Sequence, residues 1–145
     1  DQVVRGMKYT TKPGGSARRG NIAGFSEGGK TGTTEKVING TYSKKINIST
    51  FVGFAPANDP AFVLLVTVDE PEWAYIPGVG KNQMGGHCCA PVFREIARRS
   101  LEYLSVDPDD PHGYPVGDPR YNQDKADWVK ESKALVELYQ KWNAP

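Results

Sequence analysis

Lys30, Thr31, Gly32 and Thr33 are the residues of this chain whose types and spacing best suit chemistry. In an extended strand alternate side chains lie on one side, so the hydroxyls of Thr31 and Thr33 would be neighbours able to receive one carboxylate. Lys30 would add a fixed positive charge, and Gly32 has no side chain to obstruct a bound backbone. The tetrapeptide therefore predicts a site that could bind a carboxylate beside a fixed positive charge. Without its flanking sequence, the same run is more often a polar turn or strand end.

A second interpretation overlaps the first. Residues 24–31, Gly-Phe-Ser-Glu-Gly-Gly-Lys-Thr, match the phosphate-binding loop of nucleotide hydrolases, G-x-x-x-x-G-K-[ST]. Such a loop needs a buried apolar strand before its first glycine and a helix that begins at its lysine. Residues 18–23 are too polar for that strand, and the threonines and glycines that follow Lys30 disfavour a helix. The P-loop nucleotide hydrolase is kept as the alternative function, although its context is unfavourable.

Composition and charge give no support for nucleic-acid binding, a membrane span or a metal site. The 145 residues carry a formal net charge of +1 with a pI of about 7.9, and the basic residues form no single stripe, so we expect no nucleic-acid partner. The longest apolar run, residues 61–68, is far shorter than the roughly 20 residues of a membrane helix. Cys88 and Cys89 are adjacent and lack the spacing of zinc ligands, so we expect buried thiols at a helix–sheet contact, no metal and no cofactor.

The hydrophobic pattern predicts an α+β fold in which an antiparallel sheet packs against helices. The expected elements are strands at 22–34, 46–55 and 61–68, and helices within 1–10, at 90–104 and at 124–142. Asn39-Gly40 predicts a hairpin turn between the first two strands, and Pro91 falls in the first turn of the second helix. The glycines of the first strand indicate close approach of another backbone or a ligand.

The third expected strand is continuously apolar, which is typical of a central strand covered on both faces. In chain order it nevertheless comes last of three, where it would form an unpaired edge. We therefore expect the sheet to be incomplete, and a further strand from an upstream segment to pair with this edge.

Composition changes after residue 104. Residues 107–121 contain four prolines, two glycines and four aspartates in fifteen positions, which is typical of a loop or linker. The helix that follows carries an apolar stripe from Trp128 to Trp142, which we expect to dock on the domain; a partner-binding helix is the alternative. We therefore divide the chain into a domain at 1–104 and an extension at 105–145, a linker followed by an amphipathic helix.

The phrases around the tetrapeptide resemble, in order, those of the class B penicillin-binding proteins, the monofunctional peptidoglycan D,D-transpeptidases. The resemblance covers residues 1 to about 104, and Lys30-Thr31-Gly32 corresponds to the K-T-G motif of the active site. The matching phrases are Thr11–Ala17, Gly24–Phe25, Gly29–Thr33, Phe51–Pro56, Val68–Pro71 and Gly85–Phe93. Glu27 and Gly28 depart from the apolar or small residues usual in the family, and Cys88 and Cys89 replace small residues.

The resemblance implies a β-lactamase/transpeptidase-like fold and a serine-type enzyme that cross-links stem peptides through an acyl-enzyme and is acylated by β-lactams. Lys30 and Thr33 would be catalytic, the latter through its amide in the oxyanion hole, and Thr31, Gly32 and Thr33 would bind substrate. The family's other motifs, S-x-x-K and S-x-N, occur nowhere in the 145 residues. We therefore expect the nucleophilic serine on an upstream part of the same enzyme, without which the chain would be inactive.

The implied partners are that upstream part, the peptidoglycan stem peptide and β-lactam antibiotics. Other cell-division proteins are further candidates, because the phrase Pro13–Ala17 leans towards a division enzyme. The implied location is the periplasmic or extracytoplasmic face of the bacterial inner membrane, with an anchor upstream of Asp1. A non-catalytic penicillin sensor and a serine β-lactamase share the fold and stay open as alternatives.

Overall fold

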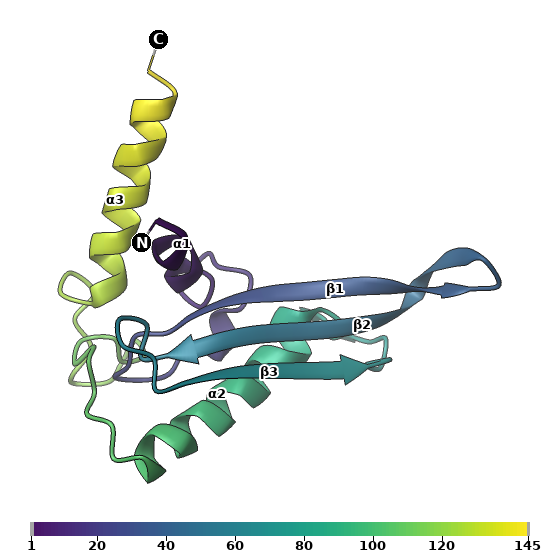
Figure 1. Ribbon diagram of the computed structural model, residues 1–145, viewed down its shortest axis with the longest axis horizontal. Helices are drawn as coiled ribbons and strands as arrows, with labels where there is room; N and C mark the ends of the chain where they lie inside the picture. The colour runs from purple at the N-terminus through teal and green to yellow at the C-terminus, as the bar shows by residue number, and fades with distance from the viewer. Residues whose placement is uncertain (1, 145) are drawn as a thin grey trace.

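The computed structural model describes residues 2–144 and consists of an antiparallel sheet with helices around it (Figure 1). The elements are α1 (Gln2–Tyr9), η1 (Arg18–Gly20), β1 (Gly28–Ile38), β2 (Thr41–Ala55), β3 (Phe62–Asp69), β4 (Tyr75–Ile76), β5 (Gly80–Lys81), α2 (Gly85–Tyr103) and α3 (Asp127–Trp142). The main sheet has the order β1-β2-β3, and both pairings are antiparallel. The predicted α+β class, with three antiparallel strands, is confirmed.

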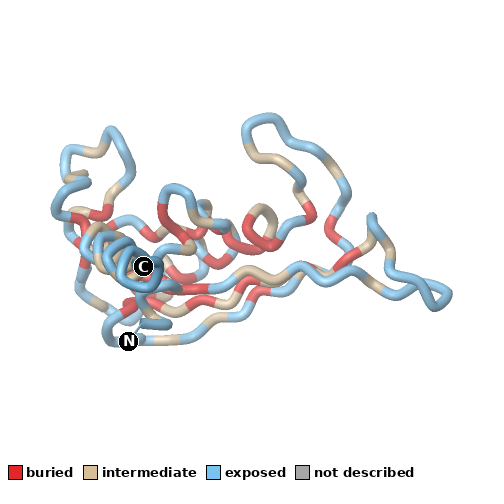
Figure 2. Tube along the Cα trace, turned by 90° about the horizontal axis from the view of Figure 1, so that it is seen from above, coloured by how far each residue is buried: buried red, intermediate tan, exposed pale blue. Residues whose placement is uncertain are grey.

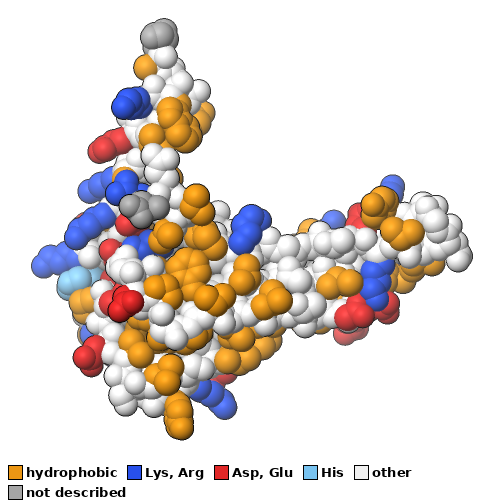
Figure 3. Space-filling view, in the orientation of Figure 1, with side chains coloured by type: hydrophobic (Ala, Val, Ile, Leu, Met, Phe, Trp, Pro, Cys, Tyr) orange, Lys and Arg blue, Asp and Glu red, His pale blue; other side chains and the backbone are white. Residues whose placement is uncertain are grey.

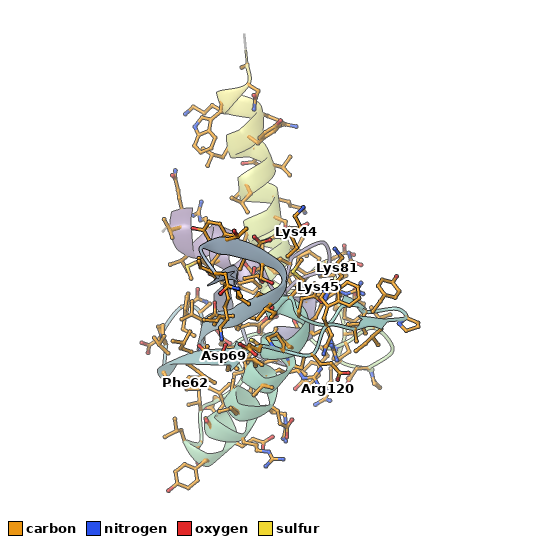
Figure 4. All side chains as sticks on the ribbon, turned by 90° about the vertical axis from the view of Figure 1, so that its right-hand side faces the viewer. Lys44, Lys45, Phe62, Asp69, Lys81 and Arg120 are labelled. Carbon is orange, nitrogen blue, oxygen red and sulfur yellow. The ribbon has the colours of Figure 1, made fainter. Side chains whose placement is uncertain are left out.

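A two-residue turn joins β1 to β2 in a long hairpin. Asn39 and Gly40 both have positive φ, 51° and 80°, which is the geometry that the right-handed twist of a hairpin favours. The predicted turn is therefore confirmed. The end of the hairpin, with Lys44 and Lys45 beside its turn, extends beyond the part of the sheet that α2 covers (Figure 1, Figure 4).

Helix α2 covers one face of the sheet, and the core lies between them (Figure 2). The rings of Phe51 from β2 and Phe93 from α2 meet edge to face, with centroids 4.9 Å apart. Buried Cys89 donates its thiol to the Ser49 carbonyl at 3.2 Å, and burial raises the pKa of that thiol to about 12. Cys89 therefore occupies the predicted helix–sheet contact, whereas Cys88, also predicted to be buried, is only half-buried.

Several predicted boundaries are wrong; β2, for example, begins at Thr41 instead of residue 46. β1 begins at Gly28 instead of residue 22, because the chain turns at Gly24, whose φ of 84° lies outside the strand region. α2 begins at Gly85 instead of residue 90, so Pro91 lies inside the helix and cannot donate to the carbonyl of His87. The Arg19 guanidinium donates to that carbonyl instead, at 2.9 Å, which satisfies the acceptor.

The third strand, β3, lies at the edge of the sheet, as its place in the chain predicted. Its apolar character predicted cover on both faces, and in this chain that expectation is wrong. Val66 faces the core and is buried, whereas Val63 and Leu65 point to the other face and are 70% and 62% exposed. One face of β3 is therefore apolar and open to solvent.

The extension turns back along the domain as a loop and then forms α3, whose base lies beside α1 (Figure 1). Lys8 of α1 contacts Asp127 at 2.5 Å, whereas Tyr139 and Trp142 near the end of α3 are 67% and 70% exposed. The expected docking of the whole apolar stripe is thus wrong for its outer half. Within residues 2–144, no helix has the length and apolar character needed to cross a bilayer.

Candidate active site

The tetrapeptide predicted to do chemistry lies on β1, at the outer edge of the sheet. Within residues 2–144, β1 pairs with β2 alone, so its other edge is open. Lys30 is the third residue of the strand, is exposed, and donates from Nζ to the Thr31 carbonyl at 2.8 Å. The site is therefore carried by an edge strand whose outer backbone groups are available for pairing.

The two glycines before Lys30 let β1 lie directly against aromatic rings. A Cβ atom at Gly28 would lie 2.6 Å from the Phe54 ring, and one at Gly29 would lie 2.4 Å from the Phe51 ring. Both distances are too short for carbon atoms in contact, so only glycine fits at these positions. The close approach predicted from the glycine-rich sequence is confirmed, and it fixes the position of the strand just before Lys30.

Register and pleat assign the four site residues to two faces of the sheet. Thr31 pairs with Phe51, which packs on α2, so Thr31 lies on the α2 side, and Thr33 lies there with it. Lys30 and Gly32 point to the opposite face, where a Cβ atom at Gly32 would lie 2.4 Å from the Thr50 hydroxyl. The structure thus brings the two threonines together as predicted and turns Lys30 to the other face.

On the α2 side, the threonine hydroxyls meet a serine and the start of a helix. Ser16 Oγ lies 3.1 Å from Thr31 Oγ1, and the backbone N–H of Gly85 donates to Thr33 Oγ1 at 3.3 Å. Gly85 is the first residue of α2, and the N-terminus of a helix carries a partial positive charge. Three hydroxyls and a positive helix end therefore gather at one place, as binding of a carboxylate requires.

The first turn of α2 approaches so closely because Gly85 and Gly86 have no side chains. A Cβ atom at Gly85 would lie 2.2 Å from the Thr50 carbonyl oxygen, and one at Gly86 would lie 1.9 Å from the Ser16 carbonyl oxygen. Sequence reasoning included Ser16 in a family phrase but gave it no role in the site. It likewise gave no role to Gly85 and Gly86, which let the first turn of α2 pack against the site.

The face of Lys30 is apolar and uncovered. We call the side chains of Val52, Phe54, Val63 and Leu65, which point away from α2, the open face. Figure 3 shows hydrophobic side chains gathered over this side of the sheet. Because Lys30 pairs with Val52 across the hairpin, its ammonium group emerges beside this apolar surface. An uncovered apolar surface of this kind is typical of a protein interface.

A buried ion pair holds the segment that leads into β1. We call Gly24–Glu27 the lead segment. Glu27 is fully buried, and its carboxylate accepts from Lys12 Nζ at 2.6 Å and from the Thr11 hydroxyl at 2.5 Å. Burial raises the pKa of the Glu27 carboxyl, against the opposing effect of Lys12. Sequence reasoning noted Glu27 only as a departure from the family pattern.

The phosphate-loop interpretation of residues 24–31 is wrong. It requires a helix that begins at Lys30, whose N-terminal N–H groups would hold the phosphates. The structure places Lys30 inside an antiparallel strand instead, with a hairpin after it. A phosphate-binding loop would direct the N–H groups around its lysine at the phosphate. In this structure the N–H groups of residues 28–31 belong to a strand instead.

Comparisons with known proteins agree with this geometry. The family model described as "Penicillin binding protein transpeptidase domain" matches residues 1–98. The probable peptidoglycan D,D-transpeptidase PenA of Neisseria meningitidis is 39% identical over 105 residues, which is 72% of this chain and 17% of that protein. Stage V sporulation protein D of Bacillus subtilis is 43% identical over 94 residues, which is 65% of this chain and 14% of that protein. The chain thus spans less than a fifth of the length of these relatives.

Solved structures show the same relationship. The transpeptidase domain of penicillin-binding protein 3 from Burkholderia pseudomallei is 33% identical with a TM-score of 0.60, over 72% of this chain and 30% of that one. Penicillin-binding protein 3 from Mycobacterium tuberculosis, solved with ampicillin, is 26% identical with a TM-score of 0.59, over 82% of this chain and 26% of that one. The chain therefore belongs to the penicillin-binding protein transpeptidase domain family.

Proposed function

We propose that this chain supplies the K-T-G strand to the active site of a serine D,D-transpeptidase, which cross-links peptidoglycan stem peptides and is acylated by β-lactams. One observation carries the proposal: an open edge strand presents Lys30 on an apolar face and the hydroxyls of Thr31 and Thr33 beside a helix N-terminus. Family membership supports it. Neither S-x-x-K nor S-x-N occurs in the chain, so the nucleophile comes from another segment.

The open face is where that segment docks in this proposal. Val63 and Leu65 are exposed there, and leaving such a surface in water is unfavourable. Lys30 lies on the same face, so a segment packed on it would bring its serine next to the ammonium group. Among the residues that the structure describes, β3 pairs with β2 alone, so its outer edge offers backbone groups for a further strand. We call the chain together with such an upstream segment the joined enzyme.

The proposed reaction is acyl transfer in two steps. The serine oxygen forms an ester bond to the carbonyl carbon of the penultimate D-alanine, and the bond from that carbon to the terminal D-alanine nitrogen breaks, with a proton passing to the leaving amine. An amine from a neighbouring stem peptide then attacks the ester carbonyl carbon and forms the amide cross-link. The bond from that carbon to the serine oxygen breaks, and a proton of the attacking amine passes to the serine. A β-lactam acylates the same serine by opening its ring.

Each residue of the tetrapeptide has a role in this reaction. Thr31 and Thr33 receive the substrate carboxylate, and Gly32 leaves room for the substrate backbone. The stem peptide adds to the outer edge of β1 as a further strand. The Thr33 amide and the amide of the nucleophilic serine form the oxyanion hole, and Lys30 places its charge beside the S-x-N serine, where it favours proton transfer during acylation.

Peptidoglycan lies outside the cytoplasmic membrane, so the proposed site of action is its extracytoplasmic side, with an anchor in the upstream part. Other cell-division proteins are proposed as further partners, and the basis is the resemblance of the Pro13–Ala17 phrase to division enzymes. This assignment is independent of the chemistry at Lys30.

The test is the intact mass of the protein after incubation with a β-lactam. We expect a stable adduct on the joined enzyme and none on this chain by itself, because the chain lacks the serine motifs. Absence of an adduct on both would overturn the proposal. Rapid hydrolysis of the β-lactam would show a β-lactamase instead, and a stable adduct without cross-linking of stem peptides would show a penicillin sensor.

A further inference from the structure

We propose that the extension, residues 105–145, positions the active site, and that Asp109 is its positioning residue. In this proposal Asp109 holds the lead segment, Gly24–Glu27, and so sets where Lys30 lies on the open face. The inference rests on the proposed catalytic role of Lys30 and goes beyond it. The family model ends at residue 98, so the extension lies outside the family match.

The contacts of the extension converge on the lead segment. One carboxylate oxygen of Asp109 accepts from the backbone N–H of Ser26 at 2.7 Å, and the other accepts from the Ser26 hydroxyl. The next residue, Asp110, donates its backbone N–H to the Gly24 carbonyl at 3.0 Å. Two successive residues of the extension thus bind two residues of the lead segment.

Tyr114 of the extension also packs against the lead segment. A Cβ atom at Gly24 would lie 2.8 Å from the Tyr114 hydroxyl oxygen, so the ring packs directly on the backbone where the chain turns. The guanidinium of Arg120, labelled in Figure 4, lies 3.6 Å from the centroid of the Tyr114 ring and pairs with Asp118 at 2.8 Å. These contacts hold the tyrosine against the lead segment.

The far end of the extension is fixed to α1. Lys8 is buried and contacts Asp127 at 2.5 Å and Glu131 at 3.4 Å, and these carboxylates outweigh burial and raise its pKa. The backbone N–H of Asp127 also donates to the Asp110 carboxylate at 3.2 Å. The extension is therefore attached at two places, to the lead segment through Asp109 and Asp110 and to α1 through Asp127.

A displacement of the lead segment would reach Lys30. The Ser26 hydroxyl also accepts from the N–H of Ala57 at 2.8 Å, so Ser26 joins the extension to the link between β2 and β3. Gly28 and Gly29, which follow the lead segment, have no free space around them. Because closely packed segments do not deform freely, loss of the Asp109 contact shifts β1 as a whole, and misplaced catalytic groups slow a reaction strongly.

The experiment compares Asp109→Ala with the wild type in the joined enzyme. Acylation by a β-lactam is followed to saturation, which separates the first-order acylation constant from the dissociation constant, and active sites are counted by adduct mass. We expect the first-order constant per active site to fall roughly threefold to tenfold with little change in binding. A role in stability alone would lower only the number of active sites and the melting temperature.

Two further variants make the result decisive. Asp107→Ala removes an exposed carboxylate of the same loop and is expected to leave the first-order constant unchanged. Asp109→Asn keeps the size and one acceptor for Ser26, so it is expected to restore most of the rate. If Asp109→Ala does not fold, Asp109→Asn tests the inference in its place, and we expect its first-order acylation constant to be about twofold lower than that of the wild type. An unchanged constant per active site would overturn this inference, whereas normal acylation by Lys30→Ala would overturn the proposed function.

Discussion

The ammonium of Lys12 lies 2.6 Å from the carboxylate of Glu27, and the two side chains are 3% and 0% exposed. The pair joins the turn that carries Ser16 to the lead segment of β1, so it links the two sides of the candidate site. Removing both groups from water costs free energy, which their attraction and the Thr11 hydroxyl at 2.5 Å offset. The position of β1 therefore depends on charges that water does not screen.

Loss of one partner of this pair will destabilise the fold strongly. Lys12→Met leaves Glu27 buried without its counter-charge, and we expect the free energy of unfolding of the joined enzyme to fall by about 3–5 kcal/mol. The exposed Lys44→Met is the control and should change it by less than about 0.5 kcal/mol. Chemical denaturation measures both. Equal effects of the two substitutions would show that the buried pair contributes nothing specific.

The same pair predicts a pH dependence. Burial raises the pKa of Glu27 above its ordinary value of 4.5, so its contribution to stability is fully present below the unfolded pKa and is lost as pH rises through the folded pKa. The melting temperature of the wild type should therefore fall relative to that of Glu27→Gln as pH rises from about 4 to about 8. Thermal unfolding of both proteins across this range measures the difference. A wild type that gains on the variant would show that Lys12 outweighs burial.

The sequence predicted the chemistry of this region better than its structural supports. Period two correctly placed Thr31 and Thr33 on one side of the strand, since alternation is a local property. Whether that side faces α2 depends on the pairing of Thr31 with Phe51. This pairing is a long-range feature that the local pattern does not contain. Sequence reasoning gave Glu27 no structural role, because its partner, Lys12, lies in a distant turn of the chain.

The boundaries of α2 show the same limit. Proline is typical of the first turn of a helix, and Pro91 therefore suggested a later start. In the structure Gly85 and Gly86 lie inside the first turn, because α2 packs there against the Thr50 and Ser16 carbonyls. Glycine is required at these two positions by tertiary packing, which local helix propensity does not describe.

That packing can be tested at Gly86. In Gly86→Ala the new Cβ would lie 1.9 Å from the Ser16 carbonyl oxygen, which forces backbone to move. We expect a loss of about 1–3 kcal/mol in the free energy of unfolding of the joined enzyme, together with slower β-lactam acylation. Gly6→Ala is the matched control, because its Cβ would meet nothing within 4 Å, and helix propensity predicts a gain of up to about 1 kcal/mol. A neutral Gly86→Ala would contradict this seating of α2.

The open face can be tested at Leu65, which is 62% exposed in this chain. If an upstream segment covers it, Leu65→Asp places a charge in an apolar interface, and we expect the joined enzyme to lose at least about 2 kcal/mol of stability. Val116→Asp, at a position that is 83% exposed, is the control and should have little effect. Denaturation of the two variants compares them directly. A tolerated aspartate at Leu65 would show that the open face stays in water.

The catalytic role of Lys30 leads to the most direct prediction. In the joined enzyme, Lys30→Ala should lower the first-order constant of β-lactam acylation roughly a hundredfold or more, because a charge that stabilises the transition state is lost. Lys45→Ala removes an exposed lysine from the neighbouring strand β2 and should leave the constant unchanged. Stopped-flow acylation followed by intact mass measures both, and melting temperatures confirm that each variant is folded. Within residues 2–144, Lys30 is exposed and donates to the Thr31 carbonyl alone, so Lys30→Ala should scarcely change the melting temperature of this chain. In the joined enzyme, a variant that is slow but folded isolates the chemical role of Lys30.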